Sequence, residues 1–247
     1  MRVAGFIPSR FGSQRFPGKP LALIHGKPMI QWVYENAKKC TMLDELWVAT
    51  DNQEIYNTVV GFGGEAIMTM EEHPSGTDRC LEAFVKSGST CDVVVNIQGD
   101  EPFIKPEMIE SLVKLFNRPE VELATLIKKI DSVDSLLNPN KVKVTISNEG
   151  KVLYFSRSPI PFCNGELAHD WVQMHTYYKH IGIYGYRANV LREICHMLPS
   201  TLEQCESLEQ LRWLENGKSI FAAITKFESP AVDSPEDIKA IENTHTL

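Results

Sequence analysis

The stretch RVAGFIPSRFGSQRFPGKPL, residues 2–21, decides how this chain folds and what it can bind. Its apolar run at 3–7 is typical of a buried strand. The loop that follows contains three cations, Arg10, Arg15 and Lys19, and no acidic residue occurs before position 35, although the formal net charge of the chain is -7. Because positive charge is concentrated here against an acidic background, the sequence predicts an anion site at this loop, above all for phosphate.

This loop differs from two common phosphate-binding loops. A Walker A loop has four residues between its glycines, whereas Gly12 and Gly18 are separated by five, and it has Ser or Thr after the lysine, where this chain has Pro20. A dinucleotide fingerprint needs three glycines at GxGxxG spacing, so an NAD site is disfavoured. An arginine can make forked, bidentate contacts to phosphate and a lysine can contribute a movable point charge. The loop therefore predicts that the side chains of Arg10, Arg15 and Lys19 bind a triphosphate. A solvated basic loop is the alternative, although open α/β sheets bind their ligands after the strands, as here.

The composition predicts a globular protein with a small-molecule partner. Its 247 residues, 43% of them hydrophobic, can bury one large core, or one core and a smaller lobe. The acidic balance argues against nucleic acid or an anionic membrane as the main partner. Only five apolar residues precede Pro8, too few for a signal-peptide core, and no later run approaches a membrane span. We therefore expect a cytoplasmic protein.

Helix and strand patterns alternate after the basic loop. The periodicity predicts helices at 28–40 and 52–62 and strands at 46–50 and 65–69. This β-α-β order predicts a parallel sheet. The turn HPSGTDR at 73–79 then begins a helix, with Thr77 as its expected N-cap.

A carboxylate follows the next strand. The apolar run DVVVNIQ at 92–98 is typical of a strand buried on both faces, and it ends in Gly99-Asp100-Glu101-Pro102. Asp100 is therefore expected at the same sheet edge as the basic loop. Mg²⁺ prefers carboxylate oxygens and takes waters and substrate phosphates as its other ligands, so Asp100 is a candidate metal ligand. An Asp that stabilises the turn, or caps a helix from Pro106, is the alternative.

The pattern changes after position 121. Four strand-like runs come without full crossover helices, at 121–127, 142–146, 152–155 and 180–186. They predict a mixed sheet and an inserted smaller lobe at about 128–187 within a single α/β domain, 1–247. The segment 159–178 has little periodicity and is expected to be a flexible lid or a subunit contact. Helices are expected at 188–197 and 207–216, and a last strand at 220–225.

A final helix start lies at VDSPEDI, 232–238. Ser234 as N-cap, Pro235 at the first helical position and Asp237 three residues after the cap form a variant capping box. Asp233 precedes the cap, so its side chain is left to point elsewhere.

Seven motifs occur in the order seen in one enzyme family. They are FIPSRFGSQRFPGKPL, HPSGTDR, VVNIQGDEP, LYFSR, HIGIYGYR, LEQLR and VDSPED. With them the chain resembles the 3-deoxy-manno-octulosonate (KDO) cytidylyltransferases, or CMP-KDO synthetases, from the first strand to the last helix. The opening loop is shared with sialic-acid activating enzymes, whereas the SGT turn, YFSR and HxGIYGY are similar to the KDO branch. The chain departs from the usual pattern in having GTDR for GTER and no glycine at 228–231.

The resemblance implies roles for individual residues. Arg10, Arg15 and Lys19 would bind the phosphates of CTP, with Lys19 stabilising charge on the α-phosphate. Three residues would surround cytosine: Pro8, Ser75 and Arg79. Asp100 and Asp233 would be the protein ligands of Mg²⁺. The residues that would contact the sugar acid are Gln98, Arg157, His180, Tyr184, Glu209 and Gln210. The catalytic set would be the three cations and the two metal ligands.

The resemblance also implies a fold and a reaction. The fold would be a Rossmann-like nucleotidyltransferase fold with a mostly parallel central sheet, and the protein a homodimer through the inserted lobe. The reaction would join CMP from CTP to the anomeric hydroxyl of KDO for lipopolysaccharide biosynthesis, which cations, Mg²⁺ and carboxylates can catalyse by positioning and neutralising charge. Transfer to an amino-KDO or another related sugar acid is one alternative. A non-catalytic nucleotide-binding regulator is the other, disfavoured by the retained cations and carboxylates.

Overall fold

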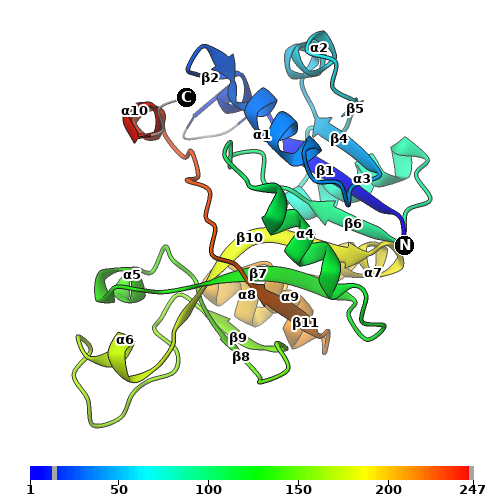
Figure 1. Cartoon of the computed structure of the whole chain (residues 1–247). Helices are drawn as coiled ribbons and strands as arrows, with labels where there is room; N and C mark the ends of the chain where they lie inside the picture. Colours follow the sequence, from blue (N-terminus) through cyan, green and yellow to red (C-terminus); the bar gives the residue numbers. More distant parts are fainter. Residues whose placement is uncertain (13–15, 245–247) are drawn as a thin grey trace. The chain divides into compact units, whose positions relative to one another are not determined.

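The computed structural model describes residues 1–12 and 16–244, and Figure 1 draws the course of the chain. The chain divides into two compact units. The first contains Met1–Val113 and Glu228–Leu247, and the second contains Lys114–Phe227. The lobe predicted at 128–187 falls within the second unit, and its part in sugar binding and dimerisation stays a prediction.

The first unit is built on a parallel sheet, as the β-α-β order predicts. Its strands, in spatial order, are β6 (Val93–Asn96), β1 (Val3–Ser9), β4 (Glu45–Thr50) and β5 (Ala66–Met68). β1 pairs in parallel with β6 on one side and with β4 on the other, and its first five residues are buried. Because both faces of β1 and β6 are covered, their apolar runs are continuous rather than alternating.

The helices of the first unit bury apolar residues at helical spacing. They are α1 (Met29–Lys38), α2 (Gln53–Gly61), α3 (Gly76–Ser87), α4 (Pro106–Leu115) and α10 (Pro235–Thr244). The N-cap of α3 is Ser75, whose Oγ accepts the N–H of Asp78 at 3.2 Å. The prediction that Thr77 is the cap was wrong, because Ser75 has the extended backbone that a cap needs, whereas Thr77 is already the second helical residue.

An apolar cluster ties the C-terminal helix to an early hairpin. The hairpin consists of β2 (Leu23–Ile24) and β3 (Lys27–Pro28), and it turns at His25 and Gly26 with φ of 49° and 75°. The sequence patterns did not predict it. The buried members of the cluster are Ile24, Met29, Val232, Ile238 and Ile241. Through this cluster, the segment around Val232 packs against the part of the chain that follows the basic loop.

The second unit contains a mixed sheet, which confirms the change of pattern predicted after position 121. Its strands are β7 (Leu123–Lys129), β8 (Lys143–Ile146), β9 (Val152–Ser156), β10 (Tyr178–Arg187) and β11 (Ile220–Ile224). β10 is antiparallel to β7 and to β8, and β9 is antiparallel to β8. β11 is parallel to β7.

The helices of the second unit differ in part from the prediction. They are α5 (Val133–Leu137), α6 (Trp171–Met174), α7 (Ala188–Cys195), α8 (Thr201–Glu206) and α9 (Gln210–Glu215). The start predicted at position 207 was wrong, because Ser207 has φ of 51° and separates α8 from α9. α8 was missed, although Ser200 and Glu203 form a capping box that the sequence displays. Across the described residues of both units, no helix is long and apolar enough to cross a membrane.

Candidate active site

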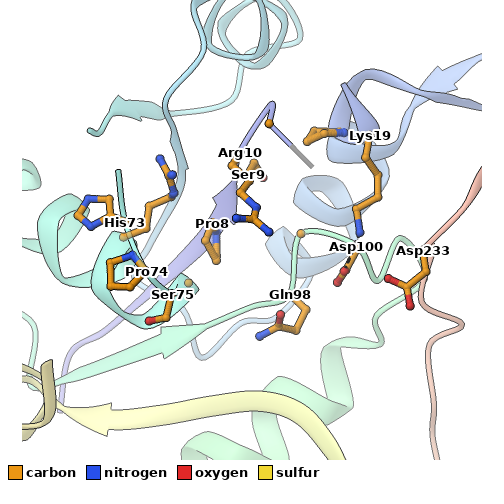
Figure 2. A pocket seen from close by; sticks show the side chains of 15 residues that line it. Pro8, Ser9, Arg10, Lys19, His73, Pro74, Ser75, Gln98, Asp100 and Asp233 are labelled. Atoms are coloured by element: carbon orange, nitrogen blue, oxygen red, sulfur yellow. Dashed lines mark hydrogen bonds and ion pairs between the residues drawn. The ribbon is translucent and has the colours of Figure 1, made fainter. Parts of the chain in front are cut away.

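A cavity of about 600 Å³ opens in the first unit after the ends of β1 and β6 and beside the start of α3. Its volume is within the range of small-molecule sites. Figure 2 shows His73, Pro74 and Ser75 at one end and Lys19, Asp100 and Asp233 at the other. The predicted site residues that line the cavity are Pro8, Arg10, Lys19, Ser75, Arg79, Gln98, Asp100 and Asp233. The structure therefore brings into one cavity the described residues predicted to hold phosphate and metal.

The loop after β1 is closed at its base. We call its described residues, 10–12 and 16–19, the phosphate loop. Gly18 has φ of 70°, which a residue with a side chain adopts only under strain, and its N–H donates to the carbonyl of Phe11 at 3.0 Å. Arg10 and Lys19 line the cavity from the two flanks of this loop. Arg15 lies outside the described residues, so its place in the site stays a prediction.

Lys19 is held at the wall of the cavity by two oxygens. Its Nζ lies 2.9 Å from Oδ2 of Asp100 and 2.8 Å from the carbonyl oxygen of Val232. The side chain of Lys19 is 15% exposed and that of Asp100 is 33% exposed, so the ion pair is partly shielded from water. The lysine thus presents a fixed positive charge at the end of the cavity where the two carboxylates lie.

Asp100 reaches the cavity because β6 ends in a close approach to β1. A side chain at Gly99 would place its Cβ 2.6 Å from the carbonyl oxygen of Pro8 and 2.9 Å from Oγ of Ser9. Only glycine fits this contact without displacing the β1 backbone. The motif GDEP therefore sets a glycine against one strand end and a carboxylate just beyond it.

Glu101 follows Asp100 but differs from it in charge. Burial raises the pKa of Glu101 to about 8, and the negative charges of Asp100 and Glu228 add to this shift. At neutral pH, Glu101 is therefore mostly protonated. The negative charge after β6 belongs to Asp100, which uses it in the ion pair with Lys19.

Asp233 reaches the same cavity from the far end of the sequence. The N–H of Val232 donates to the carbonyl of Asp100 at 2.9 Å, which fixes the two segments side by side. The N–H groups of Asp233 and Ser234 both donate to Oδ2 of Asp237, at 2.9 and 2.8 Å. Asp237 thus accepts from the cap, as the variant capping box predicts, while Ser234 donates its hydroxyl to Asp237 instead of accepting from the helix.

The chemistry of Asp100 and Asp233 fits Mg²⁺. Both supply carboxylate oxygens to one cavity. Residues 1–12 and 16–244 contain no group of three or more His, Cys, Asp or Glu side chains that could hold a metal ion. Magnesium is usually bound by one or two carboxylates and completes its shell with waters and substrate phosphates, so this pair suits an ion that binds together with a triphosphate.

The opposite end of the cavity is formed by the turn before α3. Ser75 contributes its capping hydroxyl, which also donates to Oδ2 of Asp78 at 2.7 Å. Arg79 is only 2% exposed, and its guanidinium donates to oxygens of the protein, which are considered below. Both residues line the cavity, and the contacts described here join them to other parts of the protein. Their predicted place around cytosine stays a prediction.

The residues predicted to contact the sugar acid, apart from Gln98, lie in the second unit. The ring of His180 contacts the rings of Phe155 and Tyr184, and its Nε2 is 3.0 Å from Oγ1 of Thr125. Burial lowers the pKa of His180 to about 3, so the imidazole is neutral at physiological pH. The hydroxyl of Tyr184 is buried and has no hydrogen-bond partner within the described residues. Such a hydroxyl is suited to a polar ligand.

Two further sugar candidates begin α9. Glu209 is the N-cap residue of this helix, and Gln210, its first residue, is 5% exposed. The segment before them is held by Arg157. Its Nε donates to the carbonyl of Glu206 at 2.6 Å, and its Nη2 donates to the carbonyl of Ser207 at 3.3 Å. Arg157 therefore fixes the backbone that leads into Glu209 and Gln210.

Arg157→Ala is expected to raise the apparent KM for the sugar acid about tenfold, since a hydrogen bond from a charged donor contributes about 1.5–3 kcal/mol. The affinity for CTP should barely change. Steady-state kinetics in the sugar, beside a separate measurement of CTP binding, checks this result. Arg118→Ala is the matched control, because Arg118 also donates to a main-chain oxygen of this unit, that of Glu149 at 3.1 Å. Equal losses for both substrates would assign Arg157 a general structural role.

Some residues that line the cavity were not predicted as site residues from the sequence. Ser9, Gly12, His73, Pro74 and Gly99 also line it. His73 is held by a hydrogen bond between its Nε2 and a carboxylate oxygen of Glu82 in α3. Their positions at strand ends and in the turn before α3 were the available signal, since ligands of open α/β sheets bind there.

Comparison with known proteins supplies a family for this arrangement. Residues 4–220 match the family model described as Cytidylyltransferase. A 3-deoxy-manno-octulosonate cytidylyltransferase from Parabacteroides distasonis is 51% identical, over 97% of this chain and 96% of its own length. An 8-amino-3,8-dideoxy-manno-octulosonate cytidylyltransferase from Shewanella piezotolerans is 46% identical, over 98% of each protein.

A solved structure shares the fold over nearly the whole chain. It is CMP:2-keto-3-deoxy-manno-octonic acid synthetase complexed with CTP, with a TM-score of 0.92 and 40% identity over 98% of both chains. This match confirms the predicted nucleotidyltransferase fold, and the relatives confirm the resemblance seen in the seven motifs. The chain therefore belongs to the 3-deoxy-manno-octulosonate cytidylyltransferase family.

Proposed function

We propose that this chain transfers CMP from CTP to the anomeric hydroxyl of 3-deoxy-D-manno-octulosonate and releases pyrophosphate. The observation that carries the proposal is that Arg10, Lys19, Asp100 and Asp233 line one cavity. Cations and carboxylates together suit a substrate that combines a triphosphate with a metal ion. The substrate class comes from the family, since one relative is named for this sugar acid and another was solved with CTP.

The reaction needs positioned charge rather than a nucleophilic side chain. The oxygen of the anomeric hydroxyl attacks the α-phosphorus of CTP, and the proton of this hydroxyl passes to water. The bond from this phosphorus to the oxygen that bridges to the β-phosphate breaks, and pyrophosphate leaves with that oxygen. Lys19 neutralises the charge that develops on the α-phosphate, while Arg10 and Arg15 hold the other phosphates. When bound by Asp100 and Asp233, Mg²⁺ supplies further positive charge to the phosphate oxygens.

The contacts of Lys19 prepare it for this role. Asp100 and Val232 hold its Nζ at the cavity wall, at 2.9 and 2.8 Å. A lysine that is already ordered loses less conformational entropy when the phosphate binds. Its charge is also partly shielded from water, which strengthens its interaction with an anion.

The second unit offers groups suited to a sugar acid. The neutral imidazole of His180 has one hydrogen-bond donor and one acceptor, and Tyr184 has a buried hydroxyl. The relative at 46% identity is named for an acid in which an amino group replaces a hydroxyl. That acid is therefore the second candidate substrate.

Mass spectrometry of the product tests the proposal. The protein is incubated with CTP, Mg²⁺ and a panel of sugar acids, and pyrophosphate is measured in parallel. We expect CMP-KDO and an equal amount of pyrophosphate. A product formed only from 8-amino-3,8-dideoxy-manno-octulosonate would mean that this acid, and not KDO, is the substrate. CTP binding without pyrophosphate release for any acid would instead identify a nucleotide-binding regulator.

We also propose that the protein acts as a homodimer in the cytoplasm, where it supplies CMP-KDO for lipopolysaccharide biosynthesis. Exposed apolar side chains in the predicted lobe support a subunit contact there, since Phe162 is 70% exposed and Leu167 is 68% exposed. Light scattering after gel filtration should give a mass of about twice 27.9 kDa. A monomeric mass at micromolar concentration would contradict the dimer.

A further inference from the structure

Asp51 joins the phosphate loop to the start of α3, although it does not line the cavity. It follows β4 directly, and its side chain is only 5% exposed. Its Oδ1 accepts the N–H of Phe11 at 3.0 Å, and its Oδ2 accepts Nη2 of Arg79 at 2.9 Å. One carboxylate therefore links the loop after β1 to α3.

Phe11 holds both ends of the phosphate loop through hydrogen bonds of its main chain. Its N–H donates to Asp51, and its carbonyl accepts the N–H of Gly18 at 3.0 Å. Arg10 precedes Phe11 and Lys19 follows Gly18, so both cations of the described loop lie one residue from this closure. The hydrogen bond from the N–H of Phe11 to Asp51 thus fixes the base on which both side chains are carried.

Arg79 holds Asp51 in turn. Besides the ion pair, its Nη1 donates to Oγ1 of Thr69 at 2.6 Å and to the carbonyl of Met70 at 3.0 Å. Its Nη2 also donates to the carbonyl of Glu71 at 3.2 Å. Groups that follow β5 therefore accept three hydrogen bonds from the guanidinium. Asp51 thus has a fixed partner on one oxygen and the loop on the other.

The burial of the Asp51–Arg79 ion pair indicates that the pair fixes the positions of neighbouring groups rather than adding much stability. The side chains of Asp51 and Arg79 are 5% and 3% exposed, and removing two charges from water offsets much of what their attraction contributes to stability. A buried, fully bonded carboxylate does, however, hold its partners within a narrow range of positions. Charged groups must be held in this way to act on a triphosphate without reorganising.

We propose that Asp51 is a positioning residue, which holds the phosphate loop through the N–H of Phe11 and so sets the affinity for CTP. The inference rests on the proposed use of CTP. Asp51→Ala should raise the KM for CTP about tenfold or more, while kcat and the KM for the sugar acid stay within about threefold, because Asp51 touches no reacting atom and Lys19 is also held by Asp100 and the carbonyl of Val232.

The chain offers a closely matched control. Asp44 directly precedes β4, as Asp51 directly follows it, and its Oδ2 accepts the N–H of Val3 at 2.7 Å. Asp44 therefore makes the same kind of contact to the other end of β1. Asp44→Ala should leave the KM for CTP unchanged.

A second measurement does not depend on catalysis. Amide hydrogen exchange of Phe11, followed by NMR on the full chain without nucleotide, should become at least tenfold faster in Asp51→Ala and stay unchanged in Asp44→Ala. This measurement tests the contact between Asp51 and Phe11 even if CTP is not the substrate. Whether the protein binds CTP is decided separately, by CTP binding to the unsubstituted protein. If Asp51→Ala does not fold, Asp51→Asn replaces it, since its amide can accept from only one of the two donors. An unchanged KM for CTP, or unchanged exchange of Phe11, in the folded variant would overturn the proposal.

Discussion

Replacing Lys19 by alanine should lower kcat by roughly 10²–10³-fold, the range found when one preorganised group that stabilises developing charge is removed. The side chain is the described cation that lies beside both predicted metal ligands, with its Nζ 2.9 Å from Asp100. Its loss removes positive charge where the α-phosphate is expected to react. It also leaves the carboxylate of Asp100 without this ion-pair partner. Rapid-quench measurement of CMP-KDO formation in a single turnover would report this step directly.

Two variants separate the charge of Lys19 from its packing. Lys19→Arg keeps the charge but not the point-like ammonium, so it should recover only part of the rate. Lys27→Ala is the control, because Lys27 also makes an ion pair in the first unit, 2.7 Å to Glu35, and does not line the cavity. A Lys19→Ala variant that is folded and turns over at nearly the normal rate would remove Lys19 from the reaction.

Asp233→Asn should lower the single-turnover rate by about 10²-fold or more, since a metal ion contributes several kcal/mol to transition-state charge stabilisation. The affinity for CTP should fall far less than the rate. The substitution removes a metal ligand, but it also removes negative charge from the surroundings of a triphosphate. A loss confined to the rate would place Asp233 in the reaction rather than in general nucleotide binding.

A titration with Mg²⁺ tests the shared role of the two carboxylates. Asp100→Asn and Asp233→Asn should both require more Mg²⁺ for half-maximal rate, because each removes one of two protein ligands. Asp100→Asn should show the larger defect, since it also breaks the ion pair with Lys19. Glu236→Gln is the control, because it removes a charge from the first turn of α10 and does not line the cavity. A normal rate and metal dependence in Asp233→Asn would mean that Asp233 is only a charge at a helix start.

The local parts of this protein could be predicted from its sequence. A continuous apolar run predicts β1, because a strand covered on both faces needs no polar residues. The β-α-β order predicts the parallel sheet, and the carboxyl ends of its strands predict where Arg10, Lys19 and Asp100 lie. The family motifs then supplied the role of each residue. These features depend on neighbours within a few turns or on a general rule of sheet topology.

Other features depended on distances that no local pattern records. The choice of Ser75 over Thr77 as cap was decided by backbone angles, and the guanidinium of Arg79 donates to oxygens of two segments, one after β4 and one after β5. Asp51 carries no motif that would identify it as a support of the phosphate loop. Its contact with Phe11 exists because β1 and β4 pair in register up to Ser9 and Thr50.

The meeting of Asp100 with the segment of Asp233 shows this division most clearly. Local patterns predict the glycine and the carboxylate after β6, and they predict the capped helix start that leaves Asp233 just outside α10. Only the tertiary structure brought them to one cavity, through the bond from Val232 to Asp100 and the contact of Lys19 with both. They meet because Val232 and Ile238 are buried against Ile24 and Met29, in a hydrophobic contact between distant segments. Periodicity can predict that these residues are buried, but it cannot predict which of them pack against each other.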